Sequence, residues 1–336
     1  MRAVLCREYG PYHDIGVVDV APPTGPLAPG EVLIDVAAAG VGFANVLAVA
    51  GKHQNSPPVP FIPGTEVAGI VRQVAADVDR LQAGQRVAAS MPQGAFAQQA
   101  VALADNIFDI PDNLDFPAAT NFPTLYATAY GCLVWQAHMQ PGETLLVHGA
   151  GGGRGLAAVD VGKALGATVI ATAGDDEKLA AARNAGADHL INYRDEEFRQ
   201  GVLDLTDGRG ADVIFDPVGG EVFDQSLRCI APEGRIFPIG FAGGTIPQIP
   251  ANILLVKNIS VHGVYWGYYG GWARQPRTDA NIARLQDAME QLFEWQAEGK
   301  LHPLVHGTYD LSDVSDALDV ITERRAIGKV VLTTGS

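Results

Sequence analysis

The stretch LLVHGAGGGRGLAA at residues 145–158 decides the fold class of this chain. It begins as an apolar run that suits a buried strand, continues into a glycine cluster and ends in small residues that suit a helix. The spacing GxGxxG falls here on Ala150, Gly152 and Gly155, with alanine in the first position. Such a loop lets backbone N–H groups approach a pyrophosphate at a helix N-terminus. Surface turns are also rich in glycine, so the sequence around the loop has to distinguish a dinucleotide-binding loop from a surface turn.

The sequence after the loop alternates strand and helix patterns. Residues 176–184 (DEKLAAARN) form a helical pattern that Gly186 would end. The apolar runs around the helical patterns are TLLVHG, ATVIATA, ADHLINY, ADVIFDPVGG, GRIFPIGF and NISVHGVYWG. Such alternation predicts βαβ units and a parallel sheet. In that context we predict that the loop binds a dinucleotide through Ala150, Gly152, Gly153 and Gly155.

The N-terminal part of the chain contains short β-like runs broken by proline and glycine, at residues 31–41, 64–74 and 84–90. This pattern predicts a compact all-β unit. Residues 281–298 form a long amphipathic helical pattern, and we expect the short β-like pieces after it to fold back onto the first unit. We therefore predict an α/β chain with two domains. One covers residues 1–122 plus 272–336, and the other is a doubly wound Rossmann domain over residues 123–271.

The composition limits the classes of partner. The chain has 336 residues and a formal net charge of −15, and an acidic surface repels nucleic-acid phosphates and anionic lipid. No stretch reaches the ~18 apolar residues of a membrane span, and the N-terminus lacks the apolar core of a signal peptide. The three cysteines form no CxxC pair, which favours a reduced protein. We expect a cytoplasmic protein that acts on a small molecule and binds neither nucleic acid nor membrane.

The residues after the predicted second strand of the parallel sheet bear on the choice of dinucleotide. NAD sites usually place an acidic residue there to bind the ribose 2′-hydroxyl, and Ala173 occupies that position. The candidate ligands of a 2′-phosphate are Gly174, Lys178, Tyr193 and Arg194. This favours NADPH, although Asp175 and Asp176 bring negative charge close to the phosphate. The alternative is that Lys178 and Tyr193 are ordinary surface residues.

We expect no metal site. Structural and catalytic zinc sites need three or four cysteine, histidine or carboxylate ligands, and the cysteines do not cluster. His302 and His306 are four residues apart in LHPLVH, where Pro303 and Val305 favour an extended chain. Four extended residues span about 13 Å, which is too far for one ion.

Several motifs spread over nearly the whole chain resemble one known family. They include PFIPGTEVAG, LYATAY, QPGETLLVHGAGGGRGLAA, VIFDPVGG and IPQIPANILLVKNISVHGVYWG. The chain is similar to the medium-chain dehydrogenases/reductases, and specifically to the zinc-free NADPH:quinone oxidoreductase (zeta-crystallin-like) branch. The resemblance implies a GroES-like β-domain joined to a Rossmann domain, with the active site in the cleft between them. Zinc-dependent relatives have histidine at the position of Thr65 and a cysteine ligand at that of Gly42, so both substitutions agree with a metal-free site.

The resemblance also implies roles for individual residues. Thr128 in LYATAY and Phe241 in IGFAGG would lie near the nicotinamide, and Lys329 in IGKVVL would also reach the cofactor. Arg154 departs from the family, in which a small apolar residue is usual, and either contacts the pyrophosphate or points to solvent. Family members are usually dimers, so we expect a homodimer that pairs the strand NISVHGVYW across the two-fold axis.

The expected chemistry is hydride transfer from NADPH to an electrophilic carbon, for which an activated C=C is the natural acceptor. The developing enolate then has to be stabilised and protonated. Relatives that reduce enoyl thioesters use a tyrosine in the loop AGKHQNS, where this chain has His53. Imidazole titrates near neutrality and could donate the proton, although a lone histidine is more often structural. Asn45 stands where relatives often have aspartate and could bind a substrate oxygen, whereas Gly42 replaces a usual asparagine.

Three functions remain open at this stage. The first is an NADPH-dependent reductase of activated alkenes such as enones, haloacrylates or acyl-CoA thioesters. The second is a strict quinone reductase. The third is a cofactor-binding protein with little turnover, which the residues at Gly42, Asn45 and His53 keep open. Because one scaffold of this kind accepts many substrates, the sequence does not name the natural one.

Overall fold

The computed structural model describes residues 1–335, and the contacts within the chain divide it into two units. The first unit contains Met1–Thr124, Gly267–Phe293 and the chain from Pro303 onward. The second unit contains Leu125–Trp266 and Glu294–His302. The sequence placed residues 294–302 in the first domain, and that prediction was wrong. The segment joins the second unit because Trp295 packs on Tyr130 and His302 bonds to Asp160 there.

The first unit is built on a seven-stranded sheet with the order β14-β15-β3-β4-β5-β7, in which β6 also pairs with β3. Its strands are β3 (Glu31–Val41), β4 (Glu66–Val74), β5 (Arg86–Ser90), β6 (Gln99–Leu103), β7 (Ile107–Asp109), β14 (Val305–Asp310) and β15 (Lys329–Thr333). A separate antiparallel pair joins β1 (Arg2–Leu5) to β2 (Gly16–Asp19). Since β15 pairs antiparallel with β3, the end of the chain does fold back onto the N-terminal strands.

Short helices cover this sheet. They are η1 (Tyr12–Asp14), α1 (Phe43–Val49), η2 (Ala104–Asn106), α2 (Phe116–Ala119), η5 (Leu311–Asp313) and α11 (Val314–Thr322). Side chains of β3, β4, β5 and α11 form one apolar core, in which Ile34, Val67, Val87 and Leu318 are fully buried. The long α10 (Asp279–Ala297) covers the predicted amphipathic stretch. None of the helices within residues 1–335 is both long enough and apolar enough to cross a lipid bilayer.

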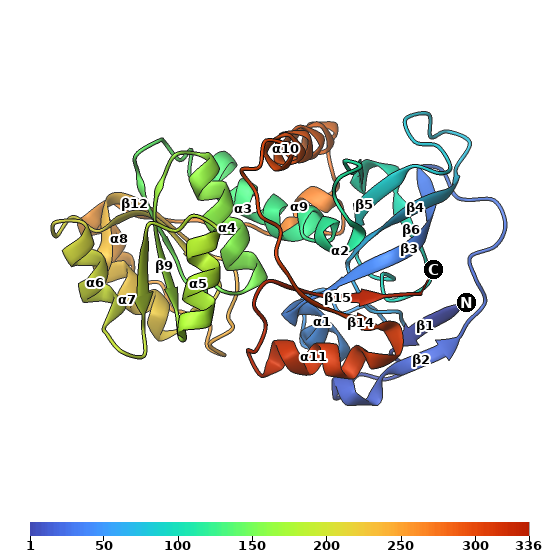
Figure 1. Cartoon of the computed structure of the whole chain (residues 1–336), viewed down its shortest axis with the longest axis horizontal. Helices are drawn as coiled ribbons and strands as arrows, with labels where there is room; N and C mark the ends of the chain where they lie inside the picture. Colours follow the sequence, from blue (N-terminus) through green and yellow to red (C-terminus); the bar gives the residue numbers. More distant parts are fainter. Residues whose placement is uncertain (336) are drawn as a thin grey trace. The chain divides into compact units, whose positions relative to one another are not determined.

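The second unit contains a six-stranded parallel sheet with the order β10-β9-β8-β11-β12-β13. Its strands are β8 (Thr144–Val147), β9 (Thr168–Ala173), β10 (His189–Asn192), β11 (Ala211–Asp216), β12 (Ile230–Pro238) and β13 (Ser260–Val261), and its helices are α3 (Ala127–Tyr130), α4 (Gly153–Ala164), α5 (Asp176–Asn184), α6 (Phe198–Leu205), α7 (Glu221–Cys229) and α8 (Ala251–Lys257). Figure 1 shows α4 and α5 on one face of this sheet and α6, α7 and α8 on the other. The strand order reverses between β8 and β11, where doubly wound sheets bind their ligands. The predicted fold class is therefore confirmed.

Three further segments of the chain are helical. The π-helical segments η3 (Phe122–Tyr126) and η4 (Gly131–Gln136) flank α3, and α9 (Trp266–Gly270) follows β13. The expected strand NISVHGVYW is only two residues long in β13, which corrects the prediction. Its two residues, Ser260 and Val261, pair with Arg235 and Ile236 of β12.

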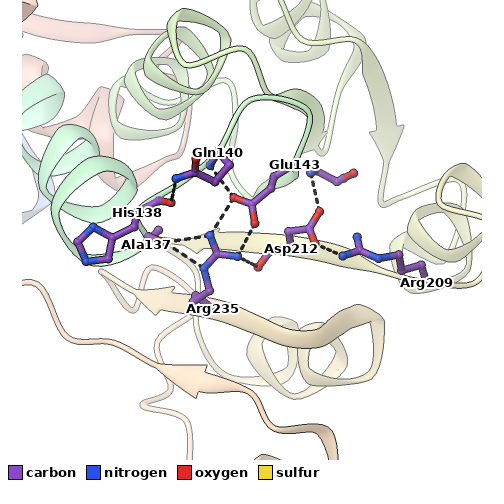
Figure 2. A network of polar contacts seen from close by, with 8 residues as sticks. Ala137, His138, Gln140, Glu143, Arg209, Asp212 and Arg235 are labelled. Carbon is purple, nitrogen blue, oxygen red and sulfur yellow. Dashed lines mark hydrogen bonds and ion pairs between the residues drawn. The ribbon is translucent and has the colours of Figure 1, made fainter.

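A polar network holds the amino-terminal ends of the central strands. Figure 2 shows the guanidinium of Arg235, from β12, between Glu143 and the backbone oxygen of Ala137. Its distances are 2.8 and 2.9 Å to the Glu143 carboxylate and 2.9 Å to Ala137 O. Asp212 in β11 accepts the Thr144 N–H at 2.8 Å and pairs with Arg209. These contacts fix the start of β8. The glycine loop follows the other end of this strand, so its position is fixed by the strand.

Candidate functional site

The glycine loop lies between β8 and α4, at the reversal of strand order. Ala150 is buried and donates its N–H to Thr172 O at 3.0 Å, and Gly152 is the N-cap of α4. A Cβ on Gly155 would lie 2.4 Å from Gly149 O and 2.6 Å from Ala150 Cα, so only glycine lets α4 approach the loop this closely. Gly153 begins α4, whose first-turn N–H groups have no partner within the helix. The predicted loop residues thus form a cradle that fits a pyrophosphate.

The loops after β11 and β12 are joined at the same edge of the sheet. Asp216 is fully buried, and its Oδ1 accepts the N–H groups of Val218 at 2.8 Å and Gly219 at 3.0 Å. Burial raises the pKa of Asp216, and these two hydrogen bonds oppose the rise. Gly243 N donates to Val218 O, which ties the second loop to the first. Phe241 lies in that second loop with 40% of its surface exposed, and a Cβ on Gly219 would meet its ring at 3.0 Å.

The sequence analysis missed Asp216. The only available signal was the position of an acidic residue at the end of a strand, in FDPVGG. Its burial and its two backbone partners appear only in the folded chain.

The candidate residues for the adenosine ribose gather after β9 and β10. A Cβ on Gly174 would lie 2.6 Å from Tyr193 Oη, and one on Gly151 would lie 2.4 Å from Lys178 Cβ. Asp175 caps α5 by accepting the Lys178 N–H at 2.9 Å, and it also pairs with Lys178 Nζ at 2.8 Å. Although burial raises it, the hydrogen bonds from Lys178 hold the pKa of Asp175 below its ordinary value. Tyr193 thus lies on Gly174 and Lys178 lies on Gly151 while it pairs with Asp175, and the contacts of these residues with a 2′-phosphate stay predictions.

Two further predicted cofactor contacts lie in the second unit. Thr128 is buried in α3, and Arg154 is half-buried in the first turn of α4. Burial raises the pKa of the Cys132 thiol, and the charge of Arg154 opposes that rise. Their contacts with a dinucleotide stay predictions.

A cavity of about 240 Å³ in the first unit brings His53 and Asn45 together. Its lining includes the apolar surfaces of Phe61, Trp272, Pro57, Pro63 and Pro92 and the neutral polar side chains of Asn45, Asn55, Thr65 and Gln93. No acidic residue, lysine or arginine is among the described residues that line it. A larger depression of about 590 Å³ lies around Asp35 and Arg72, but it contains none of the predicted site residues. We take the smaller cavity as the candidate substrate pocket.

The hydrogen bonds of the two pocket residues define which of their atoms can act. His53 Nδ1 accepts the Asn55 N–H at 3.2 Å, so the proton of the neutral imidazole lies on Nε2. Asn45 is buried, and its Oδ1 accepts the Gly42 N–H at 2.8 Å. Its amide Nδ2 is therefore the atom that can donate to a substrate oxygen. The pocket thus combines the Nε2–H of His53 with the amide donor of Asn45.

Lys329 has a partner that the sequence analysis did not foresee. Its ammonium forms an ion pair with Glu66 in the first unit, and the two side chains are 3% and 6% exposed. Glu66 also accepts a hydrogen bond from Thr124 Oγ1 at 2.5 Å. A Cβ on Gly40 would overlap both side chains of the pair, at 2.5 and 2.7 Å. In the structure Lys329 neutralises a buried carboxylate, and its contact with the cofactor stays a prediction.

The two histidines considered as metal ligands lie in different units and have different partners. His302 Nδ1 lies 3.1 Å from Asp160 Oδ1, whereas His306 Nδ1 accepts the Ile327 N–H at 3.2 Å. Across residues 1–335, no group of three or more histidine, cysteine, aspartate or glutamate side chains is placed to hold a metal ion.

Comparison with known families defines the class of protein. Residues 28–112 match the family model described as the alcohol dehydrogenase GroES-like domain, and residues 153–283 match the one described as zinc-binding dehydrogenase. The two matches fall in the first unit and mostly in the second unit, respectively. The chain belongs to the medium-chain dehydrogenase/reductase superfamily, as its motifs predicted, and it is an oxidoreductase of that superfamily.

Individual relatives indicate which branch of the superfamily the chain belongs to. The chain is 40% identical to quinone oxidoreductase-like protein 2 homolog of Nematostella vectensis, over 99% of this chain and 89% of that protein. It is 30% identical to a 2-haloacrylate reductase of a Burkholderia species, over 99% of this chain and 98% of that protein. Among solved structures, the quinone oxidoreductase of Escherichia coli in complex with NADPH superposes with a TM-score of 0.87, at 27% identity and over 99% and 100% of the two chains. These similarities place the chain in the quinone oxidoreductase branch and support a nicotinamide cofactor.

Proposed function

We propose that this protein is a zinc-independent, NADPH-dependent reductase that transfers hydride to an activated C=C bond or to a quinone. The observation that carries the proposal is the pocket that holds His53 and Asn45 among apolar and neutral polar side chains. Such a lining suits an uncharged carbonyl compound, and it offers hydrogen-bond donors where an enolate oxygen would need them.

The residues of the pocket have different roles in the proposed reaction. The glycine loop with Gly152, Gly153 and Gly155 would hold the dinucleotide, whose nicotinamide would supply a hydride when bound. Asn45 Nδ2 donates a hydrogen bond to the substrate carbonyl oxygen and stabilises the negative charge that develops there. His53 passes a proton from Nε2 to the α-carbon of an alkene or to the oxygen of a quinone, and the ring takes up a proton from water in exchange. The apolar walls at Phe61 and Trp272 exclude water from the reacting atoms.

Two observations support the choice of cofactor, and a third supports the absence of zinc from the proposal. The chain has Ala173 where NAD sites usually have an acidic residue, and Gly174, Lys178 and Tyr193 gather beside it. The solved relative from Escherichia coli binds NADPH. Thr65 lines the pocket at the position of a zinc-binding histidine in related enzymes, and its hydroxyl is a poor zinc ligand.

The proposal predicts the outcome of one assay and one substitution. NADPH oxidation should follow the addition of enones or quinones, and mass analysis of the products should show a saturated carbonyl or a hydroquinone. His53→Ala should lower kcat for an enone by about 100-fold or more, since general acids contribute that much, while the Kd for NADPH changes little. His13→Ala is the matched control, because that histidine is exposed and pairs with Asp319 outside the pocket.

The same assay separates the two alternatives. Turnover of quinones alone would favour a strict quinone reductase. Tight NADPH binding with no turnover of either class would favour a cofactor-binding protein. An unchanged kcat in His53→Ala would contradict the role of His53 as proton donor and leave the rest of the proposal to the product analysis.

We also propose that the protein is a homodimer formed through the β13 edge of the parallel sheet. Beside that edge, α8 exposes Leu255 and Val256 at 78% and 75% of their surfaces, and Ile246 is 66% exposed. Exposed apolar side chains beside a sheet edge are typical of an interface. Light scattering at micromolar concentration should give twice the mass of the chain, and Leu255→Asp should shift the mass toward that of one chain. A monomeric wild-type protein would contradict the proposal.

A further inference from the structure

An ionised carboxylate lies among the residues that would receive the 2′-phosphate of NADPH. Asp175 Oδ2 is 2.8 Å from Lys178 Nζ, and Asp175 Oδ1 accepts the Lys178 N–H at 2.9 Å. The two side chains are 36% and 22% exposed. Two side chains border the position of the 2′-phosphate. The Tyr193 hydroxyl lies over Gly174, and the aliphatic part of Lys178 lies on Gly151. Any side chain at these two glycines would displace Tyr193 or Lys178.

We propose that Asp175 is a specificity-determining residue that restrains the preference of this protein for NADPH over NADH. The proposal rests on the proposed function only in that a nicotinamide dinucleotide binds the second unit. It assigns to Asp175 an effect on the 2′ position of the adenosine ribose and none on the hydride transfer itself.

The charges at this position support the proposal. A phosphate monoester carries about −1.5 to −2 charges at neutral pH, and it would have to share Lys178 with a carboxylate that already pairs with it. Arg194 is exposed, and its charge also favours the ionised form of Asp175. The carboxylate therefore offsets the two cations that would attract the phosphate. A ribose 2′-hydroxyl brings no charge and can donate a hydrogen bond to the same carboxylate.

One substitution removes the charge of Asp175 but keeps the N-terminal cap of α5. Asp175 is the N-cap of α5, and serine is an equally good N-cap. Asp175→Ser should therefore leave the fold intact while releasing Lys178 toward the phosphate. Asp176→Ser is the matched control, because Asp176 is the next residue, is exposed and carries the same charge at the same helix end.

The readout is binding, measured by titrating each protein with NADPH and with NADH and following nucleotide fluorescence. In the wild-type protein, the two Kd values should lie within about tenfold of each other. Asp175→Ser should raise the ratio of NADPH affinity to NADH affinity by about tenfold, an effect expected for a charge in contact with its partner. The control should change the ratio by less than about twofold, since an exposed charge is screened by solvent.

A double-substitution cycle tests the coupling through Lys178. In the wild-type background, Lys178→Ala should lower the ratio, because it leaves the Asp175 carboxylate unpaired beside the 2′-phosphate. In the Asp175→Ser background, Lys178→Ala should remove most of the gain in NADPH affinity, so the double variant should return toward the wild-type ratio. A double variant that keeps the full gain of Asp175→Ser would overturn the role of Lys178 on which the proposal depends.

The possible failures can be told apart. If both dinucleotides bind and Asp175→Ser leaves the ratio as in the control, the inference about Asp175 is overturned and the proposed function stands. A wild-type preference for NADPH of more than about 100-fold would also overturn the inference alone. If neither dinucleotide binds the wild-type protein, both the inference and the proposed function are wrong.

Discussion

Lys329→Met is expected to lower the free energy of unfolding by about 3–5 kcal/mol, because it leaves Glu66 as an uncompensated buried charge. The two side chains of the pair are 3% and 6% exposed, so water cannot replace the lost ammonium. Thr124 Oγ1 and the more distant Thr65 Oγ1 would remain as donors to the Glu66 carboxylate, and two neutral hydroxyls do not balance a full charge. Chemical denaturation of both proteins at neutral pH would measure the difference.

The companion substitution tests whether the loss comes from the orphaned carboxylate. Glu66→Gln combined with Lys329→Met removes both charges, and this double variant should recover much of the stability. The cofactor role that the resemblance implied for Lys329 predicts the opposite pattern, with near-normal stability and a raised Kd for NADPH. A Lys329→Met protein that unfolds like the wild type would show that the pair does not stabilise the first unit.

Asp160→Ala is expected to lower the free energy of unfolding by about 2–6 kcal/mol, since two donors would each lose their acceptor at a cost of about 1–3 kcal/mol. Asp160 lies in α4 and is fully buried. Its Oδ2 accepts the Tyr126 hydroxyl at 2.5 Å and the His302 N–H at 2.6 Å, and its Oδ1 lies 3.1 Å from His302 Nδ1. Burial raises the pKa of Asp160, while these hydrogen bonds act against the rise.

The loss of stability in Asp160→Ala should also be detectable in the segment that Asp160 holds. Because Asp160 fixes the end of the segment Glu294–His302 on the second unit, amide hydrogen exchange at His302 should become faster in Asp160→Ala. Asp204→Ala is the control, since Asp204 is exposed in α6 and accepts a hydrogen bond from Gln200 of the same helix, and it should change stability by no more than about 0.5 kcal/mol. A loss below about 1 kcal/mol in Asp160→Ala would contradict the anchoring role.

Features encoded by neighbouring residues could be predicted from the sequence. The helix at residues 176–184 has the predicted bounds in α5, because its N-cap, its helical period and the glycine after it all lie within a dozen residues. The glycine loop was found for the same reason, since the strand, the turn and the helix start are consecutive. The substrate pocket was predicted only through resemblance, which singled out His53 and Asn45 but not Trp272, more than two hundred residues further along the chain.

The amino-acid sequence alone therefore specified the two kinds of unit, the dinucleotide loop and the identity of the polar groups near it. It did not specify the partners of the charged groups. Lys329 pairs with Glu66 from a distant strand, and Asp160 binds His302 from beyond the long helix α10. A buried charge takes whichever opposite charge or donor the fold brings within reach, and that reach depends on strand order and helix packing. Local patterns carry no information on it, so these contacts could be read only from the folded chain.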